Sequence, residues 1–417
     1  MRVLWFTNTS ANAAAEFGNS TFGGGWIAAL ENIVVHQAIH QLGICFFYNG
    51  TEYKKVTKNG VQYYGIPYAV EGKMNQIYNR HVGKIIDNTS PFIDDILTDF
   101  KPDIIHVFGT EMGYGKLLMG KFNKVVFHIQ GLLAPYTEAF FPLSISKKDA
   151  LLSGGIKPLI QGLTFYHQYI SYKVRAQREI EIVQHWKYFS GRTEWDRNFV
   201  QLINSKATYY HCDELLREVF FTAEWKLQQA FDATKTIHIG TTINPNIYKG
   251  LDLIYKVLPL LKEYDICWHL FGVTENNPLN STVKKALHIT SPNKSIQFHG
   301  QVNAETLLTE LKKCHFFVHP SYIDNSPNSV CEAMLLGMPV ISSNVGGVKS
   351  LITHNQNGFL FNPHEKFDLA GMLAYLINNY SIATLCAANA RVTAMERHNP
   401  NTIVTVLNNM YNAIYND

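Results

Sequence analysis

The stretch that decides the fold runs from Pro320 to Phe361 and reads PSYIDNSPNSVCEAMLLGMPVISSNVGGVKSLITHNQNGFLF. Within it, Ser326 is a good N-cap residue, and Pro327 suits the first helical position, where its missing N–H costs nothing. A helix is therefore predicted to begin here. The backbone N–H groups of its first turn would point outward without partners and would favour a bound anion such as a diphosphate. These groups belong to Asn328, Ser329 and Val330.

Two carboxylates flank this predicted anion site. Asp324 lies in the loop before the helix and Glu332 about one turn inside it, so both could face one ligand. Gly337 is predicted to end the helix, a strand follows at 339–342, and Gly346-Gly347 forms a tight turn. Carboxylates for sugar hydroxyls beside amides for phosphates are what a nucleotide-sugar pocket requires. Ordinary helix capping explains the same residues taken alone, so both interpretations stay open at this point.

Outward from this stretch, short apolar runs alternate with helical patterns in both halves of the chain. Such alternation predicts an α/β fold in which helices cover both faces of parallel sheets, with ligands at the carboxyl ends of the strands. One helix is predicted over 26–42, between the first two strands. The predicted strands are 3–6, 44–48, 103–108 and 125–129 in the first half, and 237–239, 267–271, 295–298, 316–318 and 339–342 in the second.

Length and composition limit the class of protein. A chain of 417 residues exceeds what one hydrophobic core usually supports, which predicts two domains. With 46% hydrophobic and 17% charged residues, the composition is that of a folded globular protein. A formal net charge of +3 does not indicate broad nucleic-acid binding, and no nucleic-acid partner is expected.

Cysteine spacing and hydropathy indicate the cellular compartment in which the protein is expected. The six cysteines are spread singly, without a CxxC pair, which favours inert thiols in a reducing compartment. The apolar run Val3–Phe6 is too short for a signal peptide, and no run of about eighteen apolar residues exists. A cytoplasmic location is expected, with peripheral contact at the inner face of the plasma membrane still open.

The stretch from Asp324 onward closely resembles the donor site of the GT-B fold glycosyltransferases of family 4. Their signature has two acidic residues eight positions apart, an Ala-Met helix, a Gly, Pro-Val-Ile and a Gly-Gly turn. The matching residues here are Asp324, Glu332, Ala333-Met334, Gly337, Pro339-Val340-Ile341 and Gly346-Gly347. The resemblance implies that Glu332 holds the ribose hydroxyls and that Asp324 and the backbone after it meet the donor sugar. The further donor-binding residues implied are Asn325, Ser326, Asn328, Ser329 and Val330.

A second matching element precedes this one. In the family, a strand ending in Gly-Arg is followed by a Lys-Gly, and the two cations neutralise the diphosphate leaving group. Lys249 matches, and a cation there would stabilise the charge that grows as the glycosidic bond breaks. Gly240 matches the strand end, but Thr241 stands where Arg is usual, and Asp324 stands where Glu is usual. Gly240 and Thr241 are still expected beside the donor, and either Lys249 works with the helix amides alone or another basic residue supplies the second charge.

The N-terminal half carries weaker matches. Gly24 and Gly25, before a predicted helix, are expected to let the backbone approach the donor. Strand ends similar to those of the family contain Glu111 and His128, and the segment from Gly191 to Asp196, which includes Arg192, resembles a segment of bacterial capsule- and surface-polysaccharide members of the family. We expect Glu111, Arg192 and Asp196 near the acceptor, with His128 a catalytic candidate beside Lys249, Asp324 and Glu332. A core histidine remains the other interpretation of His128.

The resemblance covers nearly the whole chain and implies the GT-B architecture. Two Rossmann-like domains would face each other across a cleft. The acceptor-side domain is predicted over 1–222, and the nucleotide-sugar-binding domain over 223–397. The last helix, within 398–417, would cross back to pack on the acceptor-side domain.

The resemblance implies a reaction that retains the donor's anomeric configuration. No carboxylate pair has a clear claim to the nucleophile and acid of a hydrolytic double displacement. In the front-side substitution that the family implies, the leaving diphosphate takes the acceptor's proton while Lys249 and the helix amides stabilise its charge. No metal site and no cofactor is expected. His36 and His40 stand four residues apart on the predicted helix, but no third ligand is evident. Activity that survives EDTA would support this expectation.

The expected partners are a nucleoside-diphosphate sugar, with UDP or GDP favoured, and a glycan or lipid-linked acceptor, as in bacterial surface polysaccharide synthesis. Three alternatives remain open: a nucleotide-sugar epimerase of the same fold, a non-catalytic nucleotide-sugar-binding protein, and a membrane-surface protein. The last rests on residues 144–192, where eight basic residues face only three acidic ones and aromatic residues are interleaved.

Overall fold

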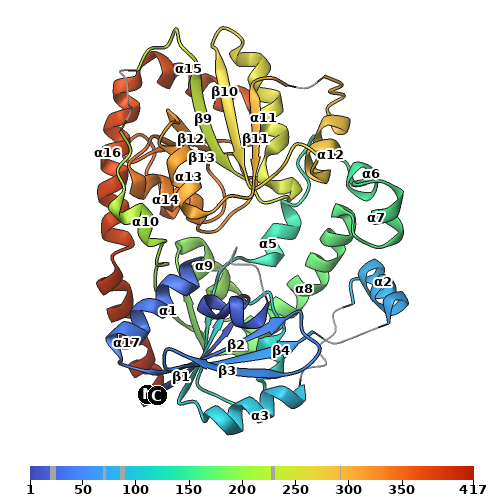
Figure 1. Cartoon of the computed structure of the whole chain (residues 1–417), viewed down its shortest axis with the longest axis vertical. Helices are drawn as coiled ribbons and strands as arrows, with labels where there is room; N and C mark the ends of the chain where they lie inside the picture. The colour runs from blue at the N-terminus through green and yellow to red at the C-terminus, as the bar shows by residue number, and fades with distance from the viewer. Residues whose placement is uncertain (19–24, 69–71, 85–89, 227–230, 292) are drawn as a thin grey trace. The chain divides into compact units, whose positions relative to one another are not determined.

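The computed structural model describes the chain except for residues 19–24, 69–71, 85–89, 227–230 and 292, and Figure 1 shows its fold with many of the helices and strands labelled. The described residues form two compact units. The first unit comprises Met1–Ala134, Ser171–Leu216 and His398–Asp417. The second unit comprises Pro135–Ile170 and Arg217–Arg397.

The first unit is built on an eight-stranded sheet with the order β3-β4-β2-β1-β5-β6-β7-β8. All neighbouring pairs are parallel except β3 and β4. These two form an edge hairpin whose turn, Asn59-Gly60, has positive φ at both residues, as a tight hairpin requires. The strands are β1 (Arg2–Thr7), β2 (Gln41–Tyr48), β3 (Lys54–Lys58), β4 (Val61–Pro67), β5 (Ile104–Phe108), β6 (Val125–His128), β7 (Tyr188–Gly191) and β8 (Thr208–His211).

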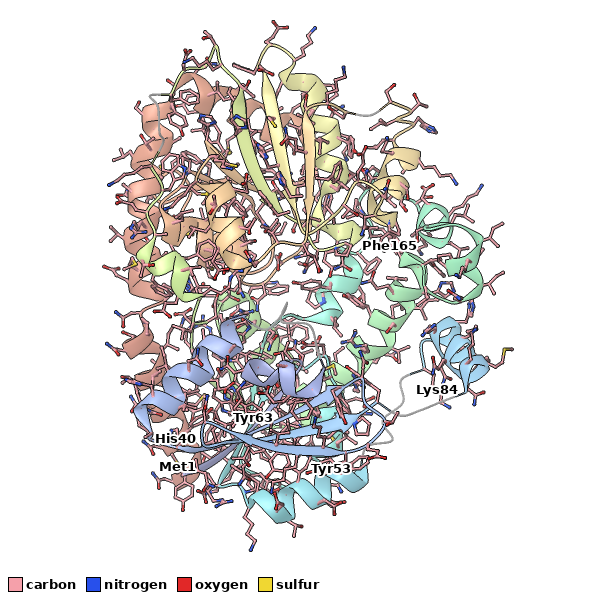
Figure 2. The ribbon with its side chains drawn as sticks, viewed as in Figure 1. Met1, His40, Tyr53, Tyr63, Lys84 and Phe165 are labelled. Atoms are coloured by element: carbon pink, nitrogen blue, oxygen red, sulfur yellow. The ribbon has the colours of Figure 1, made fainter. Side chains whose placement is uncertain are left out.

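The central strands of this sheet are buried. Val3 to Phe6 of β1 and all of β5 are inaccessible to solvent, which is why these runs are apolar, apart from His106, rather than alternating. On β4, which lies next to the edge strand β3, Tyr63, labelled in Figure 2, donates a hydrogen bond to Glu31 of the first helix. The helices of this unit are α1 (Gly25–Gln37), α2 (Lys73–Val82), α3 (Ser90–Phe100), α4 (Tyr114–Leu117), α9 (Glu194–Ile203) and α17 (Pro400–Asn416), with most of α8 (Phe165–His185) and the start of α5 (Leu133–Glu138).

The C-terminal helix α17 packs on the first unit, as predicted. Its Tyr411 is fully buried, and the hydroxyl lies 3.0 Å from Nε1 of Trp5 and 2.7 Å from Nδ1 of His106. Both partners lie on the two central strands, β1 and β5. The side chain of Tyr411 therefore ties the end of the chain to the middle of the first sheet.

The second unit is built on a six-stranded, wholly parallel sheet with the order β11-β10-β9-β12-β13-β14. This is the doubly wound Rossmann order, in which the chain reverses direction between its first and fourth strands, β9 and β12. Ligands of such sheets bind at that switch point, outside the carboxyl ends of the strands. The strands are β9 (Ile237–Thr242), β10 (Ile266–Phe271), β11 (Ile296–Gly300), β12 (Phe316–His319), β13 (Val340–Ser343) and β14 (Phe359–Phe361).

Helices connect and cover these strands. They are α6 (Lys147–Leu151), α7 (Ile156–Ile160), α10 (Glu218–Thr222), α11 (Leu251–Val257), α12 (Pro278–Ala286), α13 (Ala304–Leu311), α14 (Asn328–Leu336), α15 (Lys366–Asn378) and α16 (Tyr380–Arg397), with a short turn of 3₁₀ helix, η3 (Ile247–Lys249), before α11. Among the described residues, no single helix is long and apolar enough to cross a membrane, although α15 and the helical stretch Tyr380–Asn416, bent by 101°, pass that test as a pair.

Two features differ from the sequence-based predictions. The division at 222/223 assigns residues 135–170 to the first domain, but they lie with the second unit, where Ser144 donates a hydrogen bond to Asp252 and α6 packs on α12. The helix predicted over 26–42 ends at Gln37, because Ala38 has a positive φ and the chain then enters β2. His40 therefore leaves the helix and binds Asn408 of α17, so it makes no helical pair with His36.

Candidate functional site

The predicted donor residues Lys249 and Asp324 meet at the switch point of the second sheet. Lys249 ends η3, a few residues after β9, and Asp324 follows β12. The Nζ of Lys249 lies 2.5 Å from Oδ2 of Asp324, and the two side chains are only 15% and 11% exposed. The fold thus brings a cation and a carboxylate, 75 residues apart in the chain, to the place where a doubly wound sheet binds its ligand.

Three other groups of the second unit surround the carboxylate of Asp324. Nε2 of His319 lies 3.1 Å from Oδ2, and the Tyr136 hydroxyl and the Asn325 N–H each donate to Oδ1 at 3.2 Å. Burial alone would raise the pKa of Asp324, but Lys249 and His319 outweigh it and hold the pKa well below its usual range. Asp324 is therefore ionised at neutral pH. Burial lowers the pKa of His319, which leaves that imidazole neutral.

Glycines fix the backbone around this pair. A Cβ on Gly250, whose φ is +81°, would lie 2.0 Å from the carbonyl oxygen of Pro320. A Cβ on Gly346, whose φ is +49°, would lie 2.0 Å from the carbonyl oxygen of Asp324, and the Gly347 N–H donates to that oxygen at 3.1 Å. The Lys-Gly and Gly-Gly elements of the sequence thus mark two places where one backbone segment lies so close to another that only glycine fits.

Glu332 is held by an arginine that the sequence analysis missed. Nε and Nη2 of Arg217 donate to the two carboxylate oxygens of Glu332 at 2.7 and 2.6 Å, a bidentate pair. Burial raises the pKa of Glu332, and Arg217 opposes that rise. Arg217 stands 115 residues before its partner, so no local pattern points to it. Its position just before a short helix, α10, is the feature that could have indicated Arg217 as a candidate.

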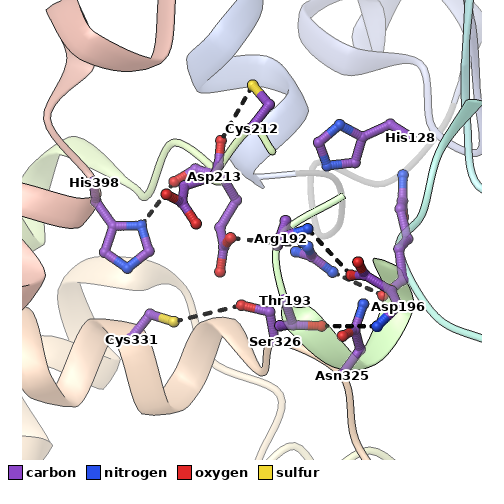
Figure 3. A network of polar contacts seen from close by, with 12 residues as sticks. His128, Arg192, Thr193, Asp196, Cys212, Asp213, Asn325, Ser326, Cys331 and His398 are labelled. Carbon is purple, nitrogen blue, oxygen red and sulfur yellow. Dashed lines mark hydrogen bonds and ion pairs between the residues drawn. The ribbon is translucent and has the colours of Figure 1, made fainter. Parts of the chain in front are cut away.

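The start of helix α14 differs from the prediction. The N-cap is Pro327 rather than Ser326, and no side chain caps the helix. Ser326 is buried, and its hydroxyl lies 3.9 Å from Sγ of Cys331 instead (Figure 3). The Val330 N–H is not free, because it donates to the Pro327 carbonyl at 2.9 Å.

Two amides remain for an anion at this helix end. Within the described part of the chain, the N–H groups of Asn328 and Ser329 have no acceptor. Asn325, the other predicted donor contact, is fully buried beside Asp324. The first turn of α14 therefore offers two of the three predicted amide donors to a ligand.

Gly240 and Thr241 serve the core rather than a ligand. A Cβ on Gly240 would lie 2.8 Å from Cδ2 of Leu311, so this glycine makes room for helix α13. Thr241 is fully buried, donates to the Val318 carbonyl at 2.7 Å and accepts from Nε1 of Trp268 at 2.9 Å. Its hydroxyl is not available to a donor, and the predicted contact through this side chain is not supported.

In the first unit, His128 and Arg192 lie at the ends of neighbouring strands, β6 and β7. Nδ1 of His128 is 3.0 Å from the Ser190 hydroxyl, and its Nε2 has no partner among the described residues. Burial lowers the pKa of His128 far below its usual value, so the ring is neutral. Arg192 is buried, donates to the Gln130 carbonyl at 2.7 Å and lies over the Trp26 ring.

Asp196 has a structural role instead of the predicted acceptor contact. It is fully buried in the first turn of α9, where its N–H donates to Oγ1 of the N-cap Thr193 at 3.2 Å (Figure 3). One carboxylate oxygen accepts from the Arg192 N–H at 3.1 Å, and the other accepts from the Tyr209 hydroxyl. Both oxygens are therefore engaged in holding the turn.

The remaining N-terminal candidates are less defined. Glu111 is partly buried, one of its carboxylate oxygens has no partner among the described residues, and burial raises its pKa. Gly24 lies outside the described residues, and Gly25 is the exposed first residue of α1.

A buried acid that no motif indicated lies close to these residues. Glu179 of α8 is fully buried, accepts from the Thr110 hydroxyl at 2.7 Å and from the Ala134 N–H at 3.1 Å, and burial raises its pKa to about 7. A single acidic residue inside a helical pattern gives no sign in the sequence that its side chain is buried. Glu179 was therefore not predicted as a site residue.

Comparison with known proteins identifies the family of the second unit. Residues 234–393 match the family model described as Glycosyl transferases group 1. An uncharacterized glycosyltransferase of Haemophilus influenzae is 32% identical over 135 residues, which are 32% of this chain and 37% of that protein. A poly(ribitol-phosphate) α-N-acetylglucosaminyltransferase of Staphylococcus aureus is 23% identical over 40% of this chain and 33% of that protein. The chain thus spans well under half the length of these curated relatives.

Solved structures resemble the whole chain. Sucrose-phosphate synthase from Thermosynechococcus elongatus superposes with a TM-score of 0.73 at 14% identity, over 100% of this chain and 99% of that one. HepE from Anabaena, solved with UDP and glucose, has a TM-score of 0.67 at 14% identity, over 99% of this chain and 100% of that one. These likenesses confirm the GT-B fold, and the family match confirms the resemblance to glycosyltransferases of group 1.

Proposed function

Since residues 234–393 belong to the group 1 glycosyltransferase family, we propose that the chain transfers a sugar from a nucleoside-diphosphate donor to an acceptor hydroxyl. The observation that carries this proposal is the buried Lys249–Asp324 pair at the switch point of the second sheet. In this proposal the cation meets the diphosphate and the carboxylate meets the sugar.

The proposed mechanism is front-side substitution with retention. The glycosidic bond breaks first, and the leaving phosphate oxygen takes the proton of the attacking hydroxyl. Lys249 and the open N–H groups of Asn328 and Ser329 stabilise the charge that develops on the diphosphate. Because Lys249 holds Asp324 ionised and fixed, Asp324 acts by positioning the donor sugar rather than by transferring a proton.

The proposed role of Glu332 is to bind the ribose hydroxyls. Its two oxygens accept hydrogen bonds from Arg217, which orients the carboxylate. A ribose hydroxyl would donate to the lone pairs that the bidentate pair leaves free.

The proposed donor is a UDP-sugar, with GDP-sugars second, and the proposed acceptor is a glycan or lipid-linked glycan of a bacterial surface polysaccharide. HepE was solved with UDP and glucose. Relatives include an amylovoran biosynthesis glycosyltransferase of Erwinia amylovora, 26% identical over 36% of this chain and 39% of that protein. The location proposed is the cytoplasm, with peripheral contact at the inner face of the plasma membrane.

The surface that would make this contact is formed by residues 143–163 of the second unit, around α6 and α7. Leu143, Ile156 and Ile160 are 85%, 76% and 63% exposed, far more than an aliphatic side chain in a core. Exposed lysines stand among them, and aliphatic side chains beside cations suit an anionic bilayer. These lysines are Lys147, Lys148 and Lys157.

Transfer is tested by incubating the chain with UDP- and GDP-sugars and glycan acceptors, with the product's anomeric configuration read by NMR. Glu332→Gln should weaken donor binding and turnover, whereas Glu263→Gln, a matched change at an 81% exposed acid, should alter neither. Wild-type turnover in Glu332→Gln would refute the role of Glu332. An inverted product would refute the mechanism, and loss of activity in EDTA would refute metal independence.

The same assay separates the alternative functions. A nucleotide-sugar epimerase would convert the donor without an acceptor, and NMR would show a new nucleotide sugar. A non-catalytic protein would bind a donor, seen as a raised melting temperature, and turn over none of the acceptors.

Vesicle co-sedimentation tests the membrane surface. Binding to anionic vesicles should exceed binding to neutral ones, weaken with salt, and fall in Ile156→Ser. Leu202→Ser is the matched control, because Leu202 is 82% exposed but lies on α9 in the first unit. Equal loss in both variants, or equal binding to neutral vesicles, would refute docking through residues 143–163.

A further inference from the structure

A row of histidines crosses the sheet of the second unit, away from the residues assigned to donor binding. Nδ1 of His238 on β9 lies 2.9 Å from Nε2 of His269 on β10, and Nδ1 of His269 lies 3.0 Å from Nε2 of His299 on β11. The register of the parallel strands explains this. His238 pairs with Cys267, two residues before His269, so the side chains of these three residues point to one face.

A thiol completes the group. Sγ of Cys267 and one ring nitrogen each of His238 and His269 all lie within 4.8 Å of one another. Cys267 and His269 are buried at 8% exposure each, while His238 is half-buried and leaves the group open on one side. Two imidazoles and a thiol on adjacent rigid strands form the donor set preferred by zinc and by metals of similar softness.

The donor atoms suit a metal. A neutral imidazole offers a metal ion one ring nitrogen with a lone pair, and a thiol binds a transition metal as the thiolate. A bound cation would therefore displace the thiol proton of Cys267.

We propose that His238, Cys267 and His269 form a site for a zinc-class transition-metal ion, with His299 orienting His269 from outside the site. The ion replaces the hydrogen bond between His238 and His269, and the ring that donates this bond moves its proton to its other ring nitrogen. Two ring nitrogens bound to one tetrahedral zinc at about 2.0–2.1 Å lie roughly 3.3–3.4 Å apart. The observed 2.9 Å needs to open by only about 0.4 Å.

The fourth position of such a site is left to solvent. His299 is not a ligand in this arrangement, because its Nε2 meets the Nδ1 of His269 that faces away from His238. A hydrogen bond to the far nitrogen of a metal-bound imidazole fixes the ring and its tautomer. The bound ion would tie β9 to β10 within the second unit's sheet.

Metal binding by the full chain tests this site without any activity assay. The protein is stripped with a chelator, dialysed, and titrated with Co²⁺ and with Zn²⁺. We expect one ion per chain, a thiolate-to-cobalt charge-transfer band, release of the thiol proton, and a higher melting temperature with Zn²⁺. A chain that binds neither ion at micromolar concentration, or binds cobalt without the thiolate band, overturns the proposal.

Variants separate this site from adventitious binding. Cys267→Ala should abolish the charge-transfer band, and His238→Gln, at the half-buried edge, should weaken binding at least tenfold. Cys386→Ala and His36→Gln are matched controls, a buried thiol on α16 and an exposed histidine on α1, and should leave binding unchanged. If Cys267→Ala fails to fold, His238→Gln alone decides, and wild-type affinity in that variant overturns the proposal.

Discussion

Replacing Lys249 by methionine tests the charge balance around Asp324. The Nζ and Oδ2 atoms lie 2.5 Å apart, and the side chains are 15% and 11% exposed. Methionine keeps most of the side chain's length but removes its charge, which leaves an ionised carboxylate buried beside a neutral His319. Removing one partner of a buried ion pair costs about 3–5 kcal/mol. We expect the free energy of unfolding of Lys249→Met to fall by that amount at pH 7.

The loss of stability in Lys249→Met should depend on the pH and on the Asp324 carboxylate. Without Lys249, burial should raise the pKa of Asp324 above its value in the unfolded chain, so the folded variant takes up a proton as the pH falls. The loss of unfolding free energy in Lys249→Met should therefore become smaller as the pH falls from 7 to 4. Adding Asp324→Asn removes the uncompensated charge, so the double variant should be more stable than Lys249→Met at pH 7.

Urea unfolding of the wild type, both single variants and the double variant gives the coupling energy of the pair. Lys262→Met, at a 79% exposed lysine, is the control and should change stability by less than about 0.5 kcal/mol. Turnover should be lost in Lys249→Met and remain lost in the double variant, because the cation that meets the leaving group is absent from both. A penalty under about 1 kcal/mol, or a double variant no more stable than Lys249→Met, would refute the reasoning.

Three further variants have expected outcomes. Thr241→Val should lower stability by about 1–3 kcal/mol without changing donor affinity, because it unpairs the buried Trp268 N–H. Glu179→Gln should gain stability over the wild type as the pH rises from about 4.5 to 7, by up to about 3 kcal/mol, because burial raises the pKa of Glu179 to about 7 and only the unfolded chain ionises in that range. Gly346→Ala should weaken UDP binding at least tenfold, since its Cβ would lie 2.0 Å from the Asp324 carbonyl.

Each of these variants has a matched comparison. Thr241→Ser keeps the hydroxyl and should restore most of the stability, whereas stability equal to that of Thr241→Val contradicts the hydrogen-bond argument. A stability difference between Glu179→Gln and wild type that is flat with pH contradicts the raised pKa. A Cβ on Gly371 meets nothing within 4 Å, so Gly371→Ala should leave UDP binding intact. Unchanged thermal protection by UDP in Gly346→Ala would contradict the close approach to Asp324.

The motif residues of the second unit were predictable because they combine local backbone needs with chemistry. Gly250 and Gly346 are glycines because a carbonyl oxygen lies where a Cβ would stand, and that constraint is visible in the sequence as Lys-Gly and Gly-Gly. Lys249 and Asp324 follow two strands whose carboxyl ends meet, so the parallel-sheet prediction already brought them together. Ser326 does not cap the helix although its residue type suits an N-cap, because its buried side chain turns toward Cys331.

Partners that lie far apart in the chain were not predictable. Arg217 meets Glu332 across 115 residues, and Glu179 meets Thr110 across 69, so no window of sequence contains either pair. Asp196 was predicted at the acceptor and instead holds the first turn of α9, because a helix-start acid has the same local pattern whether it binds a ligand or caps a helix.

By itself, the sequence determined the α/β class, the two Rossmann-like units and the helix that returns to the first unit, and it indicated the Pro320–Phe361 stretch that we propose to bind the donor. It could do so because hydrophobic period, glycine φ and helix-end chemistry act over a few residues. The tertiary structure alone decided which charges are paired, which polar groups are buried and which side chains share one face of a sheet. These properties depend on strand order and register, which long-range packing determines. They explain why the Asp324 carboxylate is ionised and held in one position, which the motif alone does not show.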